Sequence, residues 1–325
     1  MITARHILAF CTVLCVLILI SCGRSPTTAP ATKKGEAPEQ GELRLAALSP
    51  AIAVMLRDLG YEDRIVAKHD YDMVLSDQVP AAGSELGFDL EVLIKANPTH
   101  LYFQKTSAER SPKLLQIASE RGWIIIERPL NTLDDIAVTM DDLYYFFAGD
   151  PQQQPTEFDV MQAMQVMQVQ DRTPPSEGLA ASWDDLGPAS DAAGKVLVLG
   201  SIDPIGAMGP GSYHHQLIKR LGATPAITEG SMWIELDYED LIALNPDSII
   251  FIAPSQTTEA DRFGEPVKPT LDEIKQSFGP LADLPIAAFE SGRIGVIDHP
   301  LGLLPSGALG EVADEIVALF ELWAE

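Results

Sequence analysis

The chain reads D-L-E-V-L-I-K-A-N-P-T-H-L-Y-F from Asp89 to Phe103, and D-Y-E-D-L-I-A-L-N-P-D-S-I-I-F from Asp237 to Phe251. Seven of the fifteen positions are identical, at an offset of 148 residues. In each copy an acidic first turn and a Leu-Ile stripe predict a short helix, which Asn-Pro ends before apolar residues begin a strand. One helix–strand unit used twice predicts two similar α/β lobes, and a cleft between two lobes is a common place for a small molecule to bind.

The segments around both copies alternate between apolar strands and amphipathic helices. Beyond the repeat, the predicted strands are 43–48, 64–67, 123–127, 195–200 and 293–297. The predicted helices are 50–59, 111–121, 132–147, 212–222, 271–278 and 308–323, and the Gly/Pro-rich stretch 206–211 is predicted to be a loop. This alternation predicts two Rossmann-like α/β lobes with mostly parallel sheets, each covered on both faces.

The segment between the lobes, 151–194, divides into two parts. Residues 156–172 have one Phe and three Met at a spacing of three, which predicts a helix with a packing stripe. A helix of this length spans roughly 25 Å and could join two lobes as a rigid strut. Residues 174–194 are rich in Pro, Ser, Gly and Asp and are predicted to form a loose connector.

The N-terminus has the pattern of an export signal. Arg5 precedes an apolar stretch, Ile7 to Ile20, which is too short and too close to the N-terminus for a membrane span, so residues 1–21 are predicted to be a signal peptide. Residues 22–42 are mostly polar and Pro-rich, and predict a flexible tether. All three cysteines lie within the first 22 residues, so the mature domain has none to form a disulfide.

Composition and motifs exclude two classes of function. The formal net charge of −25 should repel phosphate backbones, so we expect no nucleic-acid partner. The chain contains no H-E-x-x-H, no G-x-S-x-G and no P-loop, so we expect no catalytic residues and no enzyme activity.

Several motifs, in their order and spacing, resemble the substrate-binding proteins of ABC importers for vitamin B12, ferric siderophores and haem. They are R-L-A-A-L-S-P from Arg44, L-G-Y-E-D-R-I-V-A from Leu59, V-P-A-A-G from Val79, G-P-G-S-Y from Gly209, L-G-A-T-P-A from Leu221, W-I-E-L-D-Y-E-D-L-I-A-L-N-P-D from Trp233 and G-R-I-G-V-I-D from Gly292. The resemblance covers nearly everything from residue 43 onward. It implies the class III periplasmic-binding-protein fold, in which lobes 43–150 and 195–325 are joined by one long linker helix within 151–194.

The resemblance also implies a function. The chain would be an exported solute-binding protein that captures a metal chelate, with iron or cobalt, in the inter-lobe cleft and delivers it to an ABC permease. We expect a monomer with no cofactor of its own. L-I-S-C at Leu19 to Cys22 resembles a bacterial lipobox, which implies lipidation of Cys22 and anchoring to a membrane on the periplasmic or extracytoplasmic side. The alternatives are a binder of free Zn²⁺ or Mn²⁺ and a transport-independent ligand sensor on the same fold.

The candidate ligand-binding residues lie in loops at the carboxyl ends of predicted strands, where open α/β sheets bind ligands. They are Ser49, Pro50, His69, Tyr71, Ser212, Tyr213, His214, His215 and Trp233. Ser49-Pro50 and Ser212 begin helices, whose N-terminal N–H groups suit anionic groups. In the vitamin B12 binders an aromatic residue in a position like that of Trp233 stacks on the ligand.

The histidines allow a haem hypothesis, because neutral imidazole binds iron well. His214 and His215 are adjacent, so on a helix they point about 100° apart and rarely hold one ion together. We therefore consider one of them paired with a residue across the cleft, and name Tyr71 and His214 as possible haem-iron contacts.

Two positions depart from the family pattern. Each lobe of these importer proteins usually carries an exposed Glu that meets Arg on the permease. In this chain Val54 stands at the expected first-lobe position, and Gln216 at the second. These two residues weaken the expectation that the chain docks to a permease.

Overall fold

A computed structural model describes residues 43–107, 109–148, 174–183, 188–253 and 270–325 of the chain. The predicted signal peptide, Cys22, the tether and the linker helix at 156–172 lie outside these ranges. Among the described helices, none combines the length and the apolar composition needed to cross a membrane.

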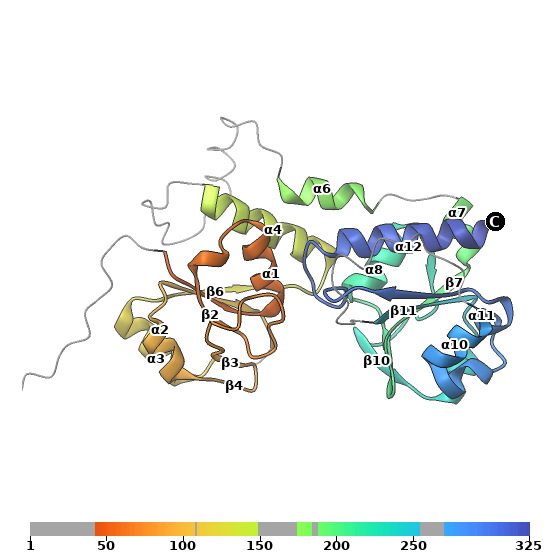
Figure 1. The fold of residues 1–325 in the computed structure, drawn as a ribbon, viewed down its shortest axis with the longest axis horizontal. Coiled ribbons are helices and arrows are strands. Elements are labelled where there is room, and N and C mark those ends of the chain that lie inside the picture. Colours follow the sequence, from red (N-terminus) through yellow and green to blue (C-terminus); the bar gives the residue numbers. More distant parts are fainter. Residues whose placement is uncertain (1–42, 108, 149–173, 184–187, 254–269) are drawn as a thin grey trace, which may run out of the picture. The chain divides into compact units, whose positions relative to one another are not determined.

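Two separate sheets define two lobes (Figure 1). The N-terminal lobe contains β1 (Leu45–Leu48), α1 (Pro50–Asp58), a short 3-10 helix (Glu62–Arg64), β2 (Ile65–Lys68), β3 (Gly83–Ser84), β4 (Gly87–Phe88), α2 (Leu90–Ala96), β5 (His100–Gln104), α3 (Pro112–Arg121), β6 (Ile124–Arg128) and α4 (Leu133–Ala148). Its main sheet has the order β2-β1-β5-β6 with every pair parallel, and β3 and β4 form a separate antiparallel hairpin.

The C-terminal lobe has a larger, mixed sheet. Two helices precede it, α6 (Pro175–Ala181) and α7 (Pro188–Ala193). Its elements are β7 (Lys195–Ile202), β8 (Ile205–Met208), α8 (Tyr213–Arg220), β9 (Thr224–Pro225), β10 (Trp233–Leu236), α9 (Tyr238–Leu244), β11 (Ser248–Ala253), α10 (Leu271–Phe278), a 3-10 helix (Gly279–Asp283), α11 (Ala287–Ser291), β12 (Ile294–Asp298) and α12 (Leu309–Ala324). The sheet order is β10-β8-β7-β11-β12, with β9 pairing the start of β7.

The duplicated unit folds the same way in both lobes. Asp89 and Asp237 cap helices of seven residues, and Asn97 and Asn245 end them in the left-handed conformation that Asn tolerates. In both lobes a basic side chain at the start of the first strand also binds the last carbonyl of this helix. The Arg44 guanidinium donates to the Ala96 carbonyl at the end of α2, and the Lys195 ammonium donates to the equivalent Leu244 carbonyl at the end of α9. The two-lobe α/β fold with mostly parallel sheets is therefore confirmed.

The central strands β1, β5, β7 and β11 are mostly buried on both faces, and the two faces belong to different hydrophobic clusters. In β1, Leu45 and Ala47 pack toward α1 and α4, while Ala46 and Leu48 pack toward α2 and α3. The C-terminal sheet divides in the same way, with α8 and α12 on one face and α9, α10 and α11 on the other. The cluster on the α1/α4 face continues into the α8/α12 face, so one core runs through both lobes.

Polar contacts reinforce this junction. The Leu133 N–H, at the start of α4, donates to the Gln216 Oε1 of α8 over 3.1 Å. Arg220 lies 3.7 Å from the Asp134 carboxylate and 5.6 Å from the Trp183 ring. Each of these contacts joins the start of α4 or the segment after α6 to α8, so the polar contacts lie beside the shared hydrophobic cluster.

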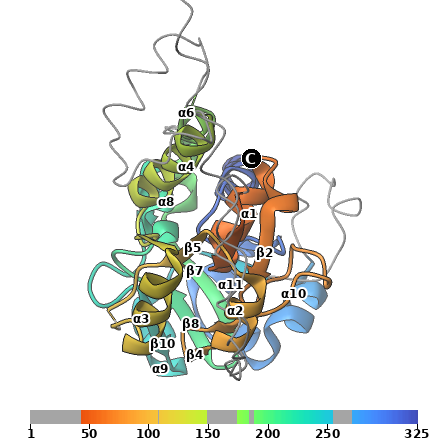
Figure 2. The same cartoon turned by 90° about the vertical axis from the view of Figure 1, so that its left-hand side faces the viewer.

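Two sequence predictions about local structure were wrong. Residues 174–194 are not a loose connector, because α6 and α7 lie within them. Leu179 and Trp183, four residues apart, are buried in the shared cluster, and α6 lies along α4 (Figures 1 and 2). The stretch 206–211 is not entirely loop either: β8 begins at Ile205 and pairs antiparallel with β7. In the first segment packing against α4 and α12 overrides the local Gly and Pro signals, and in the second the pairing of β8 with the adjacent β7 and with β10 does so.

Candidate functional site

The carboxyl ends of the parallel strands place two predicted segments on the N-terminal lobe. Ser49 follows β1 and is fully buried, and its hydroxyl has no hydrogen-bond partner. Its side chain does not cap α1, and Pro50 behind it is half-buried. Ser49 therefore presents no hydroxyl to solvent, although it stands at the expected edge of the sheet.

The loop after β2 contains one buried and one exposed candidate. The buried His69 ring accepts a hydrogen bond from the Tyr71 N–H at Nδ1 over 3.1 Å, so Nε2 carries the proton and donates to the Glu85 Oε2 over 2.9 Å. The Tyr71 side chain is 66% exposed. Lys68 and Asp72 hold the loop below it, since both bond the Leu75 backbone. In this arrangement His69 orients the loop and Tyr71 is the side chain open to a ligand.

The start of α8 is well ordered by its own hydrogen bonds. Ser212 is the N-cap, accepts from the His215 N–H and donates to the Gly209 carbonyl. The Tyr213 hydroxyl donates to the Leu303 carbonyl over 2.6 Å, and burial raises its pKa. Both side chains are engaged with the protein.

His214 and His215 are packing residues in this structure. His214 is buried and its Nε2 donates to the Gly302 carbonyl over 2.7 Å, and burial lowers its pKa to about 4. His215 donates to the Ile227 carbonyl over 3.1 Å, and burial lowers its pKa as well. The hypothesis of an iron contact by His214 paired with Tyr71 needs correction, because a buried, hydrogen-bonded imidazole is not open to a ligand.

Trp233 is the first residue of strand β10 and not a loop residue at the carboxyl end of a strand, and the pairing in the C-terminal sheet brings its ring over the second half of β7. The start of β7 pairs with β9, and its second half pairs with β8, which in turn pairs with β10 and Trp233. The indole lies against the Cα positions of Gly200 and Gly206, where a Cβ would come within 2.9 Å and 1.9 Å of ring atoms. Because these neighbours are glycines, the ring packs directly on the backbone and still remains 44% exposed.

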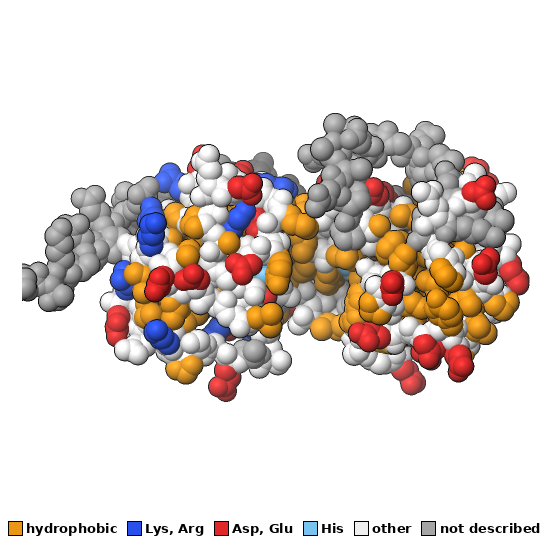
Figure 3. Space-filling model, turned by 60° about the horizontal axis from the view of Figure 1, so that its bottom comes forward, with side chains coloured by type: hydrophobic (Ala, Val, Ile, Leu, Met, Phe, Trp, Pro, Cys, Tyr) orange, Lys and Arg blue, Asp and Glu red, His pale blue; other side chains and the backbone are white. Residues whose placement is uncertain are grey.

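Sequence reasoning missed several exposed apolar side chains in the same loops. Met73 lies in the Tyr71 loop, Leu86 at the tip of the β3–β4 hairpin is 92% exposed, and Met232 precedes Trp233. The signal was present, because large apolar residues in loops without a helical or strand period are candidates for ligand contact. On the face drawn in Figure 3, hydrophobic side chains lie on both lobes, and basic side chains are visible only on the N-terminal one.

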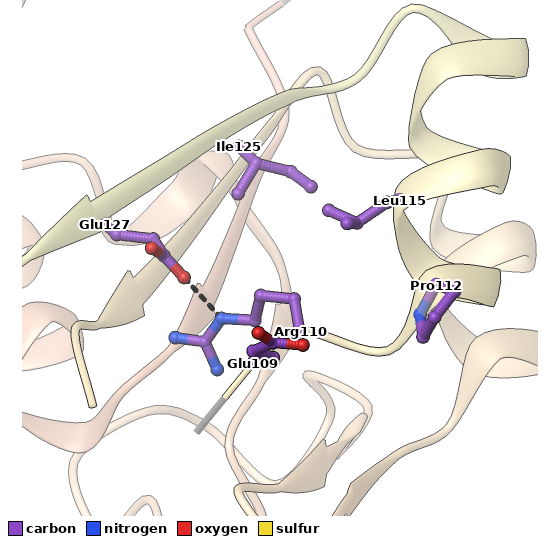
Figure 4. A pocket seen from close by; sticks show the side chains of 6 residues that line it. All are labelled: Glu109, Arg110, Pro112, Leu115, Ile125 and Glu127. Carbon is purple, nitrogen blue, oxygen red and sulfur yellow. Dashed lines mark hydrogen bonds and ion pairs between the residues drawn. The ribbon is translucent and has the colours of Figure 1, made fainter. Parts of the chain in front are cut away.

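A pocket that no sequence signal predicted lies at the edge strand of the N-terminal sheet. It has a volume of about 590 Å³ and lies between α3 and β6, as Figure 4 shows. Its lining residues are Glu109, Arg110, Pro112, Leu115, Ile125 and Glu127. Its charged residues lie just beyond β5 and at the end of β6, the same edge of the sheet that carries Tyr71.

The structure shows the surroundings of Val54 and Gln216, the two positions where the family pattern has an exposed Glu. Val54 is buried in α1, so it is not where an exposed docking carboxylate would stand. Gln216 accepts the Leu133 N–H across the lobes and serves their junction. Among the described residues, no group of three or more His, Cys, Asp or Glu side chains could hold a metal ion.

Solved structures with this fold were found, although no family model and no curated protein matches the sequence. The periplasmic vitamin B12 binding protein BtuF of Vibrio cholerae matches with a TM-score of 0.58 and 14% identity, over 86% of this chain and 97% of that chain. The periplasmic haem-binding protein HutB of Vibrio cholerae matches with a TM-score of 0.59 and 17% identity, over 86% and 99%.

A third structure, the periplasmic haem-binding protein RhuT from Roseiflexus sp. RS-1 in its apo form, matches with a TM-score of 0.57 and 20% identity, over 88% and 100%. At these identities the likeness establishes the fold. This chain has the fold of the periplasmic substrate-binding proteins, as the resemblance in sequence predicted.

Proposed function

We propose that this chain is a non-catalytic, extracytoplasmic solute-binding protein for an ABC importer. Its ligand would be a metal chelate of the cobalamin, haem or ferric siderophore class, held in a cleft between the carboxyl ends of the two sheets. BtuF binds vitamin B12 and HutB and RhuT bind haem, and their folds support this ligand class.

The observation that carries the proposal is the position of Trp233. An aromatic ring packed on glycine backbone costs little entropy to hold in place, and its exposed part provides a flat apolar platform. On the N-terminal lobe, Tyr71 and Met73 in the loop after β2 and Leu86 at the tip of the β3–β4 hairpin also expose apolar surface. Flat macrocyclic or aromatic chelates bury well against such surfaces.

Calorimetric titration of the mature domain with cyanocobalamin, hemin and ferrichrome tests the proposal. We expect one of the three to bind with a micromolar or lower Kd, and Trp233→Ala to weaken it at least tenfold. Tyr238→Ala is the matched control, because Tyr238 is a similarly exposed aromatic residue on α9. If folded protein binds none of the three, or if both variants behave alike, the assignment of the site fails.

Anchoring through lipid on Cys22 is a separate part of the proposal. The L-I-S-C motif supports it. Expressed in a bacterial host, the full chain should label with radioactive palmitate and sediment with membranes, and Cys22→Ala should abolish both. Delivery to a permease, and a monomeric state in solution, are proposed from the fold and are checked by reconstituted uptake and by light scattering.

A further inference from the structure

The pocket between α3 and β6 has one apolar side and one charged end (Figure 4). Leu115 and Ile125 approach each other across it, and Pro112 lies at the start of α3 beside them. The charged end is formed by Glu109, Arg110 and Glu127.

Arg110 is held in place before any ligand arrives. Its Nε donates to the Glu127 Oε1 over 2.5 Å, and its Nη2 donates to the Gln104 carbonyl over 2.8 Å. The guanidinium carbon lies 4.3 Å from the centre of the Phe103 ring, and the side chain is only 11% exposed. Two of the five N–H donors of a guanidinium are used in these bonds, and the group has little conformational freedom left to lose.

The charges at this end of the pocket are unbalanced. The two carboxylates, of Glu109 and Glu127, flank one guanidinium, so the charged end carries a formal charge of −1. Figure 4 places the Glu109 carboxylate beside the Arg110 side chain. A ligand carboxylate entering here would be attracted by one group and repelled by two. An amide would be complementary, because its carbonyl accepts from Arg110 and its N–H donates to a Glu oxygen.

We propose that this pocket is a subsite for a neutral amide side group of the ligand, and that it selects amide-bearing chelates over carboxylate-bearing ones. The inference rests on the proposed function, because it assumes that a chelate binds at this edge of the sheet. It narrows the ligand class to neutral, amide-rich complexes, such as corrinamides or ferrichrome-type chelates, and disfavours porphyrins that carry propionates. The net charge of −25 also disfavours ligands that carry negative charge.

The test compares amide and carboxylate forms of one ligand. The probes are cyanocobalamin, its separated monocarboxylate isomers with one peripheral amide hydrolysed, ferrichrome and hemin. The variants are Glu109→Gln/Glu127→Gln, which removes both negative charges, and Arg110→Gln, which removes the positive one. Glu120→Gln is the matched control, because Glu120 is an exposed residue of α3 that does not line the pocket.

We expect the wild-type protein to bind cyanocobalamin or ferrichrome more tightly than hemin. If cyanocobalamin is bound, at least one monocarboxylate isomer should bind about tenfold more weakly than the parent, a penalty typical of one partly screened charge contact. Glu109→Gln/Glu127→Gln should largely remove this penalty, and Arg110→Gln should weaken binding of the amide form. If ferrichrome is bound, Arg110→Gln should weaken it about tenfold and Glu120→Gln should not.

Three outcomes would overturn the inference. A wild-type preference for hemin would contradict it and leave the proposed function intact. If a chelate binds and none of the pocket variants changes its affinity, the subsite is also contradicted and the proposed function stands. Failure to bind any chelate would refute both the proposed function and the subsite.

Discussion

Adding a single methyl group at Gly206 tests whether the Trp233 ring contacts the ligand. Gly206 has no positive φ, so alanine is sterically allowed on its own backbone, but its Cβ would lie 1.9 Å from Cζ2 of the Trp233 ring. An ordinary contact is 3.4–4 Å, so the ring has to move by at least about 1.5 Å. Because the ring is the outer part of a half-exposed side chain, we expect it to shift outward at a cost of about 1–2 kcal/mol to folding.

Such a shift removes the platform from its position, and misplacement of a contact surface by more than 1 Å reduces binding strongly. We therefore expect Gly206→Ala to weaken chelate binding about tenfold or more in calorimetric titration. The variant Gly206→Ala/Trp233→Ala should bind no worse than Trp233→Ala alone, because the two changes act through the same ring. Gly178→Ala is the control, since nothing lies within 4 Å of its added Cβ.

Two measurements together test whether the Trp233 ring contacts the ligand. Trp233 is the exposed tryptophan of the four, the other three being buried, so its emission maximum reports its movement. If emission shows that the ring has moved in Gly206→Ala while the Kd stays within twofold of wild type, Trp233 does not contact the ligand.

The remaining predictions concern the lobe junction, acid sensitivity and the N-terminal loop. Gln216→Ala removes the acceptor for the Leu133 N–H and should lower the free energy of unfolding in urea by about 1 kcal/mol, whereas Gln216→Glu should retain stability. The pKa of His214 is lowered to about 4, so the unfolded chain binds a proton that the folded chain excludes. Stability should therefore fall as pH falls below about 6.5, by about 2 kcal/mol from His214 between pH 7 and pH 5, and His214→Phe should show a correspondingly flatter dependence. Tyr71→Ala should weaken chelate binding several-fold, and Val138→Ala, an exposed apolar change on α4, should not. An unchanged urea midpoint in Gln216→Ala would contradict the first prediction. A pH dependence of stability in His214→Phe as steep as that of the wild type would contradict the second, and equal affinities of Tyr71→Ala and Val138→Ala would contradict the third.

The duplicated unit was predictable because its signals are local. Asp at the N-cap, a Leu-Ile stripe and Asn-Pro at the end determine where α2 and α9 begin and end, whatever packs against them. The apolar strands that follow are buried on both faces, and their β-branched and aromatic composition already indicates this. The other helices and strands that were predicted in the two lobes followed from the same kind of signal, whereas β8 and β10 depend on pairing within the sheet.

The roles of the candidate site residues depend on contacts that residue type does not reveal. The chemistry of His214 and His215 suggests ligand contact, but their role depends on their burial and on the carbonyls of Gly302 and Ile227, which only the folded chain brings to them. Arg110 carried no local signal, since it becomes notable only when β6 brings Glu127 to it and β5 brings Phe103 beneath it. Burial and hydrogen-bond partners are properties of the packed chain and cannot be assigned from residue type.

The sequence by itself determined the two-lobe α/β architecture, because helix caps, helix ends and strand composition act over a few neighbouring residues. Only the tertiary structure decided which of the candidate side chains are open to a ligand. It buried Ser49 and His214, left Tyr71 and Trp233 exposed, and assembled the Arg110 pocket. The physical reason is that exposure depends on which distant segments pack together, and the same residue types occur in buried and in exposed positions.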